Sequence, residues 1–123
     1  VAFNSAMNAI TAATRLKLGH VGTSQEGRGA AFDVAREVIS VANAKGIKAD
    51  IDRVLALMDK DFHEHADHKP SMLQDVLQKR QTEVDFINGA AVREAEKLGM
   101  KIPVTKTLYQ LIKVIQAHYE DIL

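Results

Sequence analysis

The chain contains no cysteine, and this absence removes several kinds of chemistry at once. Without cysteine there can be no disulfide, no thiol nucleophile and no thiolate ligand for a metal ion. The composition fits a reducing compartment, and we expect a cytoplasmic protein.

The chain also lacks an excess of charge of one sign. Sixteen basic and sixteen acidic residues cancel, and the two signs are interspersed along the sequence. Proteins that bind nucleic acid or anionic lipid usually gather lysine and arginine into runs or patches. We therefore predict that neither nucleic acid nor a membrane surface is a partner.

Long apolar runs are missing as well. No segment approaches the roughly 20 apolar residues that a membrane-spanning helix needs, and no basic segment followed by an apolar stretch resembles a signal peptide. The 123 residues are enough for one domain with a single core.

Apolar residues recur at helical spacing nearly everywhere, and no segment alternates apolar and polar residues as a strand would. We predict an all-α fold, with a loop at 18–24 where two glycines fall. The small segment 89–91 predicts the close approach of another helix. The expected helices cover about residues 1–17, 25–45, 51–65, a short segment from Ser71, 83–98, and a last helix introduced by Pro103.

The first residues have neither an initiator methionine nor a helix cap. Helical spacing nevertheless begins at once, with Phe3, Met7, Ile10 and Thr14. We interpret residues 1–123 as one helical domain of a longer polypeptide.

Two polar clusters mark predicted helix starts. Ser71 has Gln74 three residues later, a pattern typical of a capping box. Thr82 repeats the pattern with Asp85, which would put Glu83 in a first helical turn, where the helix dipole favours a carboxylate. A hydroxyl, free amides and an ionised glutamate could hold a small oxoacid, although capping alone shows only where helices begin.

Asn4 and Asn8 lie one helical turn apart. Asparagine is a poor residue for a helix interior, because its side chain competes for backbone groups. Two such residues on one side of a helix indicate a polar role. Spacing leaves two alternatives open, a structural tie to a neighbouring loop and the binding of a ligand.

Three histidines near the end of the third helix, His63, His65 and His68, suggest metal ligands at first sight. Only the pairs His63 with Asp67 and Glu64 with His68 have the i, i+4 spacing that shares a helix face. The two pairs lie on different faces and offer no third ligand, so we predict no metal site.

The glycines at 27 and 29 suggest a phosphate-binding loop. Such a loop needs a buried strand before it and a helix that starts at its last glycine, and neither is predicted here. Any dinucleotide site of this type must lie outside residues 1–123.

Four segments taken together resemble the C-terminal helical domain of ketopantoate reductases (2-dehydropantoate 2-reductases), and they span almost the whole chain. They are Asn4-xxx-Asn8, Pro70-Ser71-Met72-Leu73-Gln74-Asp75, Thr82-Glu83-Val84-Asp85-xx-Asn88-Gly89 and Leu98-Gly99-Met100-xx-Pro103. The resemblance implies a multi-helix domain of the 6-phosphogluconate-dehydrogenase C-terminal-like type. Family members join it to an N-terminal Rossmann domain that binds NADPH. They reduce the 2-oxoacid 2-dehydropantoate to pantoate, on the route to pantothenate and coenzyme A.

Carried over residue by residue, the resemblance also implies roles. Glu83 matches a catalytic glutamate that interacts with the substrate and with a lysine, and that also contacts the cofactor. Asn4 matches a substrate-binding asparagine, with Asn8 one turn further on, and Ser71 matches the serine at the substrate carboxylate. The proton-donating lysine falls immediately before Val1, so residues 1–123 alone should be inactive. The Rossmann domain and a 2-oxoacid are the implied partners, and the resemblance is compatible with a homodimer.

One position departs from the family pattern. Many members carry a further substrate-binding asparagine about ten residues after the second one, where this chain has Leu18. Another 2-oxoacid is therefore an alternative substrate. The alternative from a different class is a non-catalytic helical module that docks a partner through the small-residue face at 89–91 or through the last helix.

Overall fold

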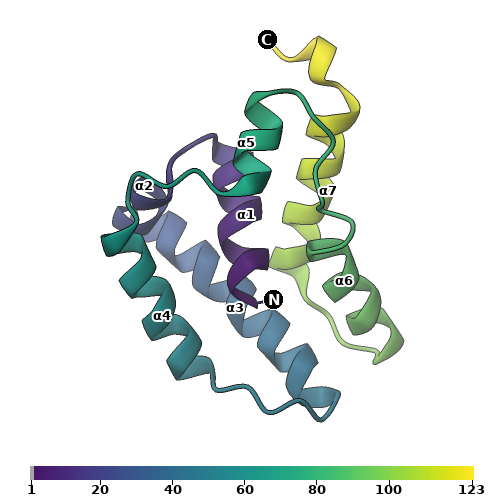
Figure 1. Ribbon diagram of the computed structural model, residues 1–123. Coiled ribbons are helices and arrows are strands. Elements are labelled where there is room, and N and C mark those ends of the chain that lie inside the picture. Colours follow the sequence, from purple (N-terminus) through teal and green to yellow (C-terminus); the bar gives the residue numbers. More distant parts are fainter. Residues whose placement is uncertain (1) are drawn as a thin grey trace.

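The computed structural model describes residues 2–123, and within them it contains helices and no strand (Figure 1). This confirms the predicted all-α fold, while the predicted first residue of the opening helix, Val1, lies outside the described part. The elements are α1 (Ala2–Thr14), α2 (Leu18–Thr23), α3 (Gln25–Ala44), α4 (Ile51–Glu64), α5 (Ser71–Leu77), α6 (Asn88–Lys97), α7 (Pro103–Ala117) and a short 3-10 helix, η1 (Tyr119–Asp121).

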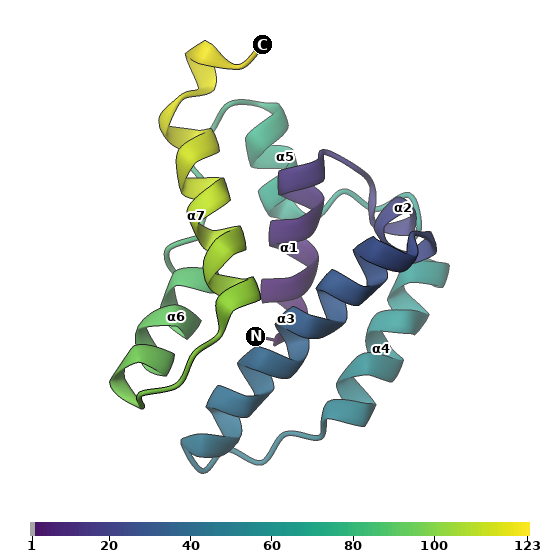
Figure 2. The same cartoon turned by 180° about the vertical axis from the view of Figure 1, so that it is seen from behind.

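Helix α1 lies at the centre of the molecule, with α3 on one side and α5, α6 and α7 around it (Figures 1 and 2). Every residue from Ser5 to Ala12 is buried, as expected for a helix that is covered on all sides. One side of α1, including Met7 and Ile10, enters a large apolar cluster with α2, α3, α4 and α6. Another side, including Ala9 and Ala12, enters a smaller cluster with α5 and α7.

The predicted loop at 18–24 is wrong, because Leu18–Thr23 form the helix α2. Its two glycines serve close packing against α4 and the residues that follow it. A Cβ at Gly19 would lie 2.6 Å from the Cβ of Ala66, and one at Gly22 would lie 2.4 Å from the ring of Phe62. Glycine, read from sequence as a helix breaker, here lets two helices touch.

Two predicted helix ends are confirmed. Gly46 and Gly99 adopt positive φ angles of 85° and 67°, and the next residues, Ile47 and Met100, donate backbone hydrogen bonds back into α3 and α6. Helix α1 ends three residues earlier than predicted, because Arg15 has a φ of 58°.

Helix α4, the third of the helices predicted from the sequence, starts where it was expected. The Asp50 carboxylate accepts hydrogen bonds from the backbone N–H groups of Asp52 and Arg53. Met58 and Phe62 are buried on its apolar face. The helix ends at Glu64, so the i, i+4 histidine pairs considered above do not form on one helix.

The last helix begins at Pro103 as predicted, and Thr105 is anchored by Glu37 of α3, whose Oε1 accepts hydrogen bonds from the Thr105 backbone N–H (2.8 Å) and hydroxyl (2.7 Å). Ile112 is fully buried, whereas its neighbour Leu111 is 48% exposed. Leu111 lies off the stripe that Leu108, Ile112 and Ile115 form at i, i+4 and i+7.

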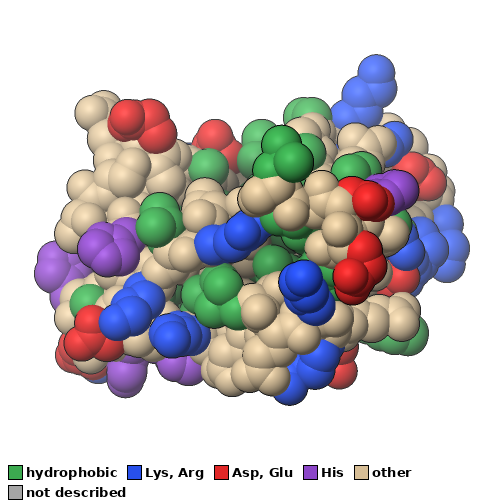
Figure 3. Space-filling model, turned by 90° about the horizontal axis from the view of Figure 1, so that it is seen from above, with side chains coloured by type: hydrophobic (Ala, Val, Ile, Leu, Met, Phe, Trp, Pro, Cys, Tyr) green, Lys and Arg blue, Asp and Glu red, His purple; other side chains and the backbone are tan. Residues whose placement is uncertain are grey.

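Charged residues of both signs lie on the surface of the domain. On the face seen from above, acidic and basic side chains are interleaved (Figure 3). Within residues 2–123, no helix is long and apolar enough to cross a membrane.

Candidate functional site

Asn8 ties α1 to the first turn of α5. Its side chain is only 6% exposed, and its Oδ1 accepts hydrogen bonds from the Met72 backbone N–H (3.4 Å) and the Ser71 hydroxyl (3.5 Å). The unpaired N–H groups at a helix start need acceptors, and Asn8 supplies one from a distant helix. The structure therefore gives Asn8 a structural role, one of the two alternatives left open by its spacing.

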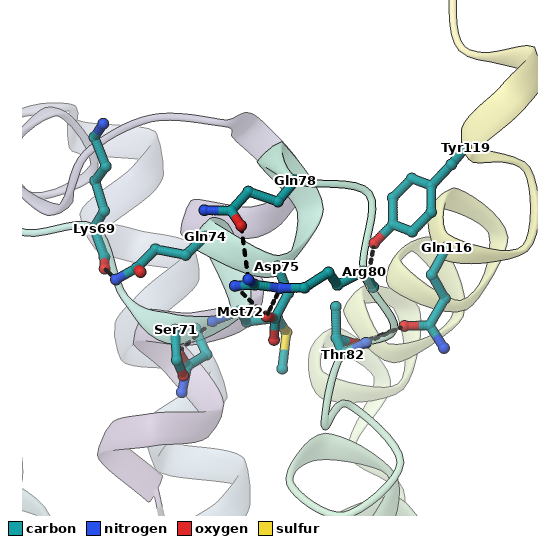
Figure 4. A network of polar contacts seen from close by, with 11 residues as sticks. Lys69, Ser71, Met72, Gln74, Asp75, Gln78, Arg80, Thr82, Gln116 and Tyr119 are labelled. Atoms are coloured by element: carbon teal, nitrogen blue, oxygen red, sulfur yellow. Dashed lines mark hydrogen bonds and ion pairs between the residues drawn. The ribbon is translucent and has the colours of Figure 1, made fainter.

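The predicted capping box at Ser71 does not form. Pro70 occupies the N-cap position without a side-chain hydrogen bond, and the Gln74 side chain donates to the Lys69 carbonyl instead (2.7 Å; Figure 4). The Ser71 side chain lies on the surface. Its hydroxyl is thus both held by Asn8 and open to solvent.

Asn4 lies one turn before Asn8 on α1. Its side chain is exposed, in contrast to that of Asn8. Ser5, the next residue, is fully buried, and its backbone carbonyl accepts a hydrogen bond from the Asn88 side chain (3.0 Å).

Glu83 is not in a helix, which corrects the predicted helix at 83–98. Residues 82–87 form a run of turns, here called the Glu83 turn, and α6 begins only at Asn88. The residues on either side of Glu83 are buried: Thr82 is 5% exposed and Val84 is fully buried. Tertiary contacts of these neighbours override the local helical pattern. The Glu83 side chain itself is exposed.

The second predicted capping box is only half correct. The Thr82 hydroxyl oxygen accepts a hydrogen bond from the Val84 N–H (3.2 Å). Asp85 does not return to Thr82, and its two carboxylate oxygens are bound by the Tyr109 hydroxyl (2.6 Å) and the Lys113 ammonium (3.0 Å), both from α7.

These contacts shift three ionisation equilibria. The Tyr109 hydrogen bond, followed by that of Lys113, lowers the pKa of Asp85. The same hydrogen bond raises the pKa of Tyr109, and the carboxylate of Asp85 raises the pKa of Lys113. The three contacts therefore favour the ionised Asp85 carboxylate, the neutral Tyr109 hydroxyl and the protonated Lys113 ammonium.

The predicted close approach at Gly89 is confirmed. A Cβ there would lie 2.9 Å from the ring of Tyr109 on α7. Gly89 is covered by α7, whereas Ala90 and Ala91 line an apolar groove on another side of α6.

Sequence reasoning missed two groups of residues. Asn88 is fully buried and links the end of the Glu83 turn to α1, but asparagine before glycine also has many ordinary turn functions. The α7 residues Tyr109, Lys113 and Gln116 were missed because the apolar stripe dominates the pattern of that helix. Their polar i, i+4, i+7 spacing is the signal that would have found them.

Of the four predicted site residues, the structure brings two into contact, Asn8 and Ser71. Asn4 lies on the same helix as Asn8, and Glu83 belongs to a turn whose far end is bonded to that helix through Asn88. Within residues 2–123, no hydrogen bond or ion pair joins Glu83 to the other three. The exposed Asn4 amide, Ser71 hydroxyl and Glu83 carboxylate belong to α1, to the start of α5 and to the Glu83 turn, and the last two segments are tied to α1 through Ser71 and Asn88.

Two other features do not belong to this site. An apolar groove of about 470 Å³ lies among α1, α3, α4 and α6, with the Lys45–Glu94 ion pair on its wall, and none of the four residues lines it. Arg28, between the two glycines considered for a phosphate loop, is paired with Asp59 of α4 and lies over the Phe32 ring. Arg28 therefore has a structural role inside α3.

The described residues also limit what the domain could hold. No group of three or more His, Asp or Glu side chains within residues 2–123 is placed to bind a metal ion. The glycines at 27 and 29 lie inside a helix with no strand before it in this part of the chain, so they do not form a dinucleotide phosphate loop.

Comparison with known proteins gives the class and then the family. Solved structures that the chain resembles include oxidoreductases. D-mandelate dehydrogenase, solved as a ternary complex with NADH and anilino(oxo)acetate, has 26% identity and a TM-score of 0.91, over 97% of this chain and 40% of that one. A PanE/ApbA family ketopantoate reductase from Ralstonia eutropha JMP134 has 29% identity and a TM-score of 0.85, again over 97% and 40% of the two chains.

A curated 2-dehydropantoate 2-reductase from Pyrobaculum aerophilum is 38% identical over 116 residues, which are 92% of this chain and 40% of the relative. The family model described as "Ketopantoate reductase PanE/ApbA C terminal" matches residues 1–116. The chain belongs to this family, which confirms the resemblance found in the sequence. It spans about 40% of the length of the curated relative.

Proposed function

We propose that this chain is the substrate-binding part of an NADPH-dependent 2-dehydropantoate 2-reductase, which acts in pantothenate and coenzyme A biosynthesis in the cytoplasm. Family membership supports the reaction class. The observation that carries the assignment of the site is Glu83, an exposed carboxylate whose two neighbours are buried and hydrogen-bonded. A carboxylate displayed in this way is suited to bind a cationic or hydroxyl group of another molecule or domain.

In this proposal NADPH, when bound, supplies the hydride to the ketone carbon, and the N-terminal Rossmann domain holds most of it. The residues described here offer no phosphate-binding loop, so we assign only Glu83 to contact with the cofactor. Charge that develops on the substrate oxygen needs a nearby cation or proton donor. Glu83 holds the ammonium group of the lysine that the resemblance places before Val1, and keeps it charged and oriented.

The remaining residues bind and orient the substrate. The exposed Asn4 amide donates to a substrate oxygen, and the Ser71 hydroxyl donates to the substrate carboxylate. The Oδ1 of Asn8 holds Ser71 (3.5 Å) and the Met72 N–H (3.4 Å). Its amide Nδ2 is the group that donates to the substrate.

The test is turnover of NADPH with ketopantoate by the full-length protein. Glu83→Ala should lower kcat by about 100-fold or more, the range typical of a lost acid-base or charge-stabilising group, with unchanged helical circular dichroism. Glu83→Gln is the matched control that keeps the shape and removes the charge, and it should lose nearly as much. Undiminished turnover by Glu83→Ala would refute the assignment, and residues 1–123 alone should show no turnover.

A second candidate keeps the reaction class and changes the substrate. Leu18, at the position where many family members have a substrate-binding asparagine, is fully buried in the large apolar cluster, so it offers no polar group. D-mandelate dehydrogenase, with the same fold at 26% identity, acts on a substrate with an aromatic group. A panel of aliphatic and aromatic 2-oxoacids, compared by kcat/KM, decides between the two candidates.

A further inference from the structure

We propose that three side chains on one face of α7, Tyr109, Lys113 and Gln116, are positioning residues that fix the Glu83 turn for the reaction. The proposal rests on the proposed function, because it needs Glu83 to act. The three residues are spaced i, i+4 and i+7, so they project from the same side of the helix. All three bind the Glu83 turn, and none of them is close in sequence to it.

Gln116 fixes the residue before Glu83. Its Oε1 accepts hydrogen bonds from the Thr82 backbone N–H (3.0 Å) and from the Thr82 hydroxyl (2.6 Å; Figure 4). The same hydroxyl oxygen accepts from the Val84 N–H (3.2 Å). One glutamine therefore restrains the backbone immediately before Glu83 and, through Thr82, immediately after it.

Tyr109 and Lys113 fix the residue two positions after Glu83. Their hydroxyl and ammonium groups each bind one oxygen of the Asp85 carboxylate (2.6 and 3.0 Å). Arg93 of α6 adds a hydrogen bond to the Asp85 carbonyl (2.9 Å). Because both carboxylate oxygens are engaged from one helix, Asp85 can neither rotate nor slide along α7 without losing a bond.

Glu83 itself lies between these two anchored points. Its carbonyl accepts hydrogen bonds from the N–H groups of Phe86 and Ile87 (3.0 Å each), while its side chain extends into solvent. The restrained turn thus fixes the position of the Glu83 backbone, from which the carboxylate extends. A group held in place before the reaction loses little in reorganisation, and small misplacements are costly to rate.

The experiment uses the full-length reductase, with kcat and KM measured for NADPH and ketopantoate. Tyr109→Phe removes one oxygen, and Gln116→Leu removes the acceptor of Thr82. Each should lower kcat by about tenfold, since misplacement by a fraction of an ångström to 1 Å costs up to about 100-fold. The KM for NADPH should change less than about twofold, because we assign the binding of the NADPH phosphates to the Rossmann domain.

Two variants serve as matched controls. Tyr119→Phe removes a hydroxyl-to-carbonyl bond of the same length, 2.6 Å to the Arg80 carbonyl, which lies outside the Glu83 turn, and it should leave kcat within about twofold. Gln116→Glu keeps an oxygen that can accept both bonds from Thr82 and should restore most of the kcat lost in Gln116→Leu. Equal losses in Tyr119→Phe and Tyr109→Phe would overturn the proposal.

A double variant separates positioning from other effects. In the Glu83→Ala background, Tyr109→Phe should cause no further loss of the residual rate, because residues that act through one group are not additive. A second, independent loss would show that Tyr109 acts elsewhere and would overturn the proposal. If Glu83→Ala is impaired but Tyr109→Phe and Gln116→Leu are fully active, the positioning proposal fails and the proposed function stands. A fully active Glu83→Ala enzyme would instead refute the assignment of Glu83.

Discussion

The start of α5 and the Glu83 turn looked alike in the sequence, and the structure holds them in different ways. At the α5 start, the side-chain hydrogen bonds from another helix come from one buried residue, Asn8, whose amide oxygen accepts from both Ser71 and Met72. The Glu83 turn has several supports, from Gln116, Tyr109 and Lys113 of α7. At both places a residue of a distant helix supplies hydrogen bonds that the predicted capping box would have supplied locally. Only the Glu83 turn receives such bonds from more than one residue.

From this contrast we expect substitutions in the two parts of the candidate site to differ in their effect on the stability of the domain. The loss of Asn8 removes every side-chain hydrogen bond that ties the α5 start to α1, whereas the loss of one of the α7 residues leaves the other hydrogen bonds to the Glu83 turn in place. The four predictions that follow test this difference by thermal and chemical unfolding of residues 1–123, in order of decreasing effect.

The largest effect is expected at Leu18, whose backbone N–H bonds to the His68 carbonyl just before α5 (3.1 Å). Leu18→Asn introduces the asparagine that the resemblance implies at this position. It should destabilise the domain by about 3 kcal/mol, since it removes a buried apolar side chain and buries an amide for which this apolar cluster offers no hydrogen-bond partner. Leu18→Met is the control and should cost less than about 1.5 kcal/mol. An unchanged free energy of unfolding in Leu18→Asn would show that this position can turn outward.

Asn8→Ala should cost about 2 kcal/mol, because it leaves the Met72 N–H at a buried helix start without an acceptor. Asn4→Ala, one turn away at an exposed position, should change the stability by less than about 0.5 kcal/mol. Urea unfolding of both variants checks the difference. Equal costs would mean that Asn8 is not the anchor of α5.

Thr82→Val should cost only about 1 kcal/mol, less than Asn8→Ala, although its side chain is equally buried. The variant keeps the shape of the side chain and the backbone bond from residue 82 to Gln116, and the Asp85 contacts remain. A cost larger than that of Asn8→Ala would contradict the redundancy of the turn.

The smallest effect is a pH dependence. Because the pKa of Asp85 is lowered in the folded domain, its stabilisation is present above the unfolded-state pKa of about 4 and is lost as pH falls through the lower folded-state value. The difference in Tm between the wild type and Asp85→Asn should therefore be constant near neutral pH and shrink below about pH 4. Since the pKa values of Tyr109 and Lys113 are raised, their contribution should be lost at the alkaline end, above about pH 10.

A difference in Tm that grew as the pH fell below 4 would contradict this assignment. Asp33→Asn is a suitable control, because Asp33 forms only an exposed ion pair with Arg36 of the same helix (3.2 Å).

The sequence predicted the fold well wherever a local signal and the tertiary structure agree. Asp50, Gly46, Gly99 and Pro103 act through their own backbone neighbourhood, and each marks a helix end where it was expected. The prediction failed at Gly19, because the packing partner that requires a glycine there, Ala66, is 47 positions away in the sequence.

The candidate site was predicted as a set of residues but not as a geometry. The resemblance supplied Asn4, Asn8, Ser71 and Glu83, and their roles in the reaction stay predictions. The local pattern at Thr82 and Asp85 did predict polar contacts, but it assigned them to each other. Their actual partners are on α7, 24 to 34 positions further along the chain, and no periodicity within the turn itself could indicate them.

Different sides of helix α1 enter the two apolar clusters. We therefore expect the whole domain to unfold as one unit. If α1 detached, α3 and α4 would lose a wall of one cluster while α5 and α7 lost a wall of the other. Partial opening of either half is therefore suppressed, and the transition should be all-or-none. The helix that displays Asn4 would then be among the last segments to become accessible to a protease.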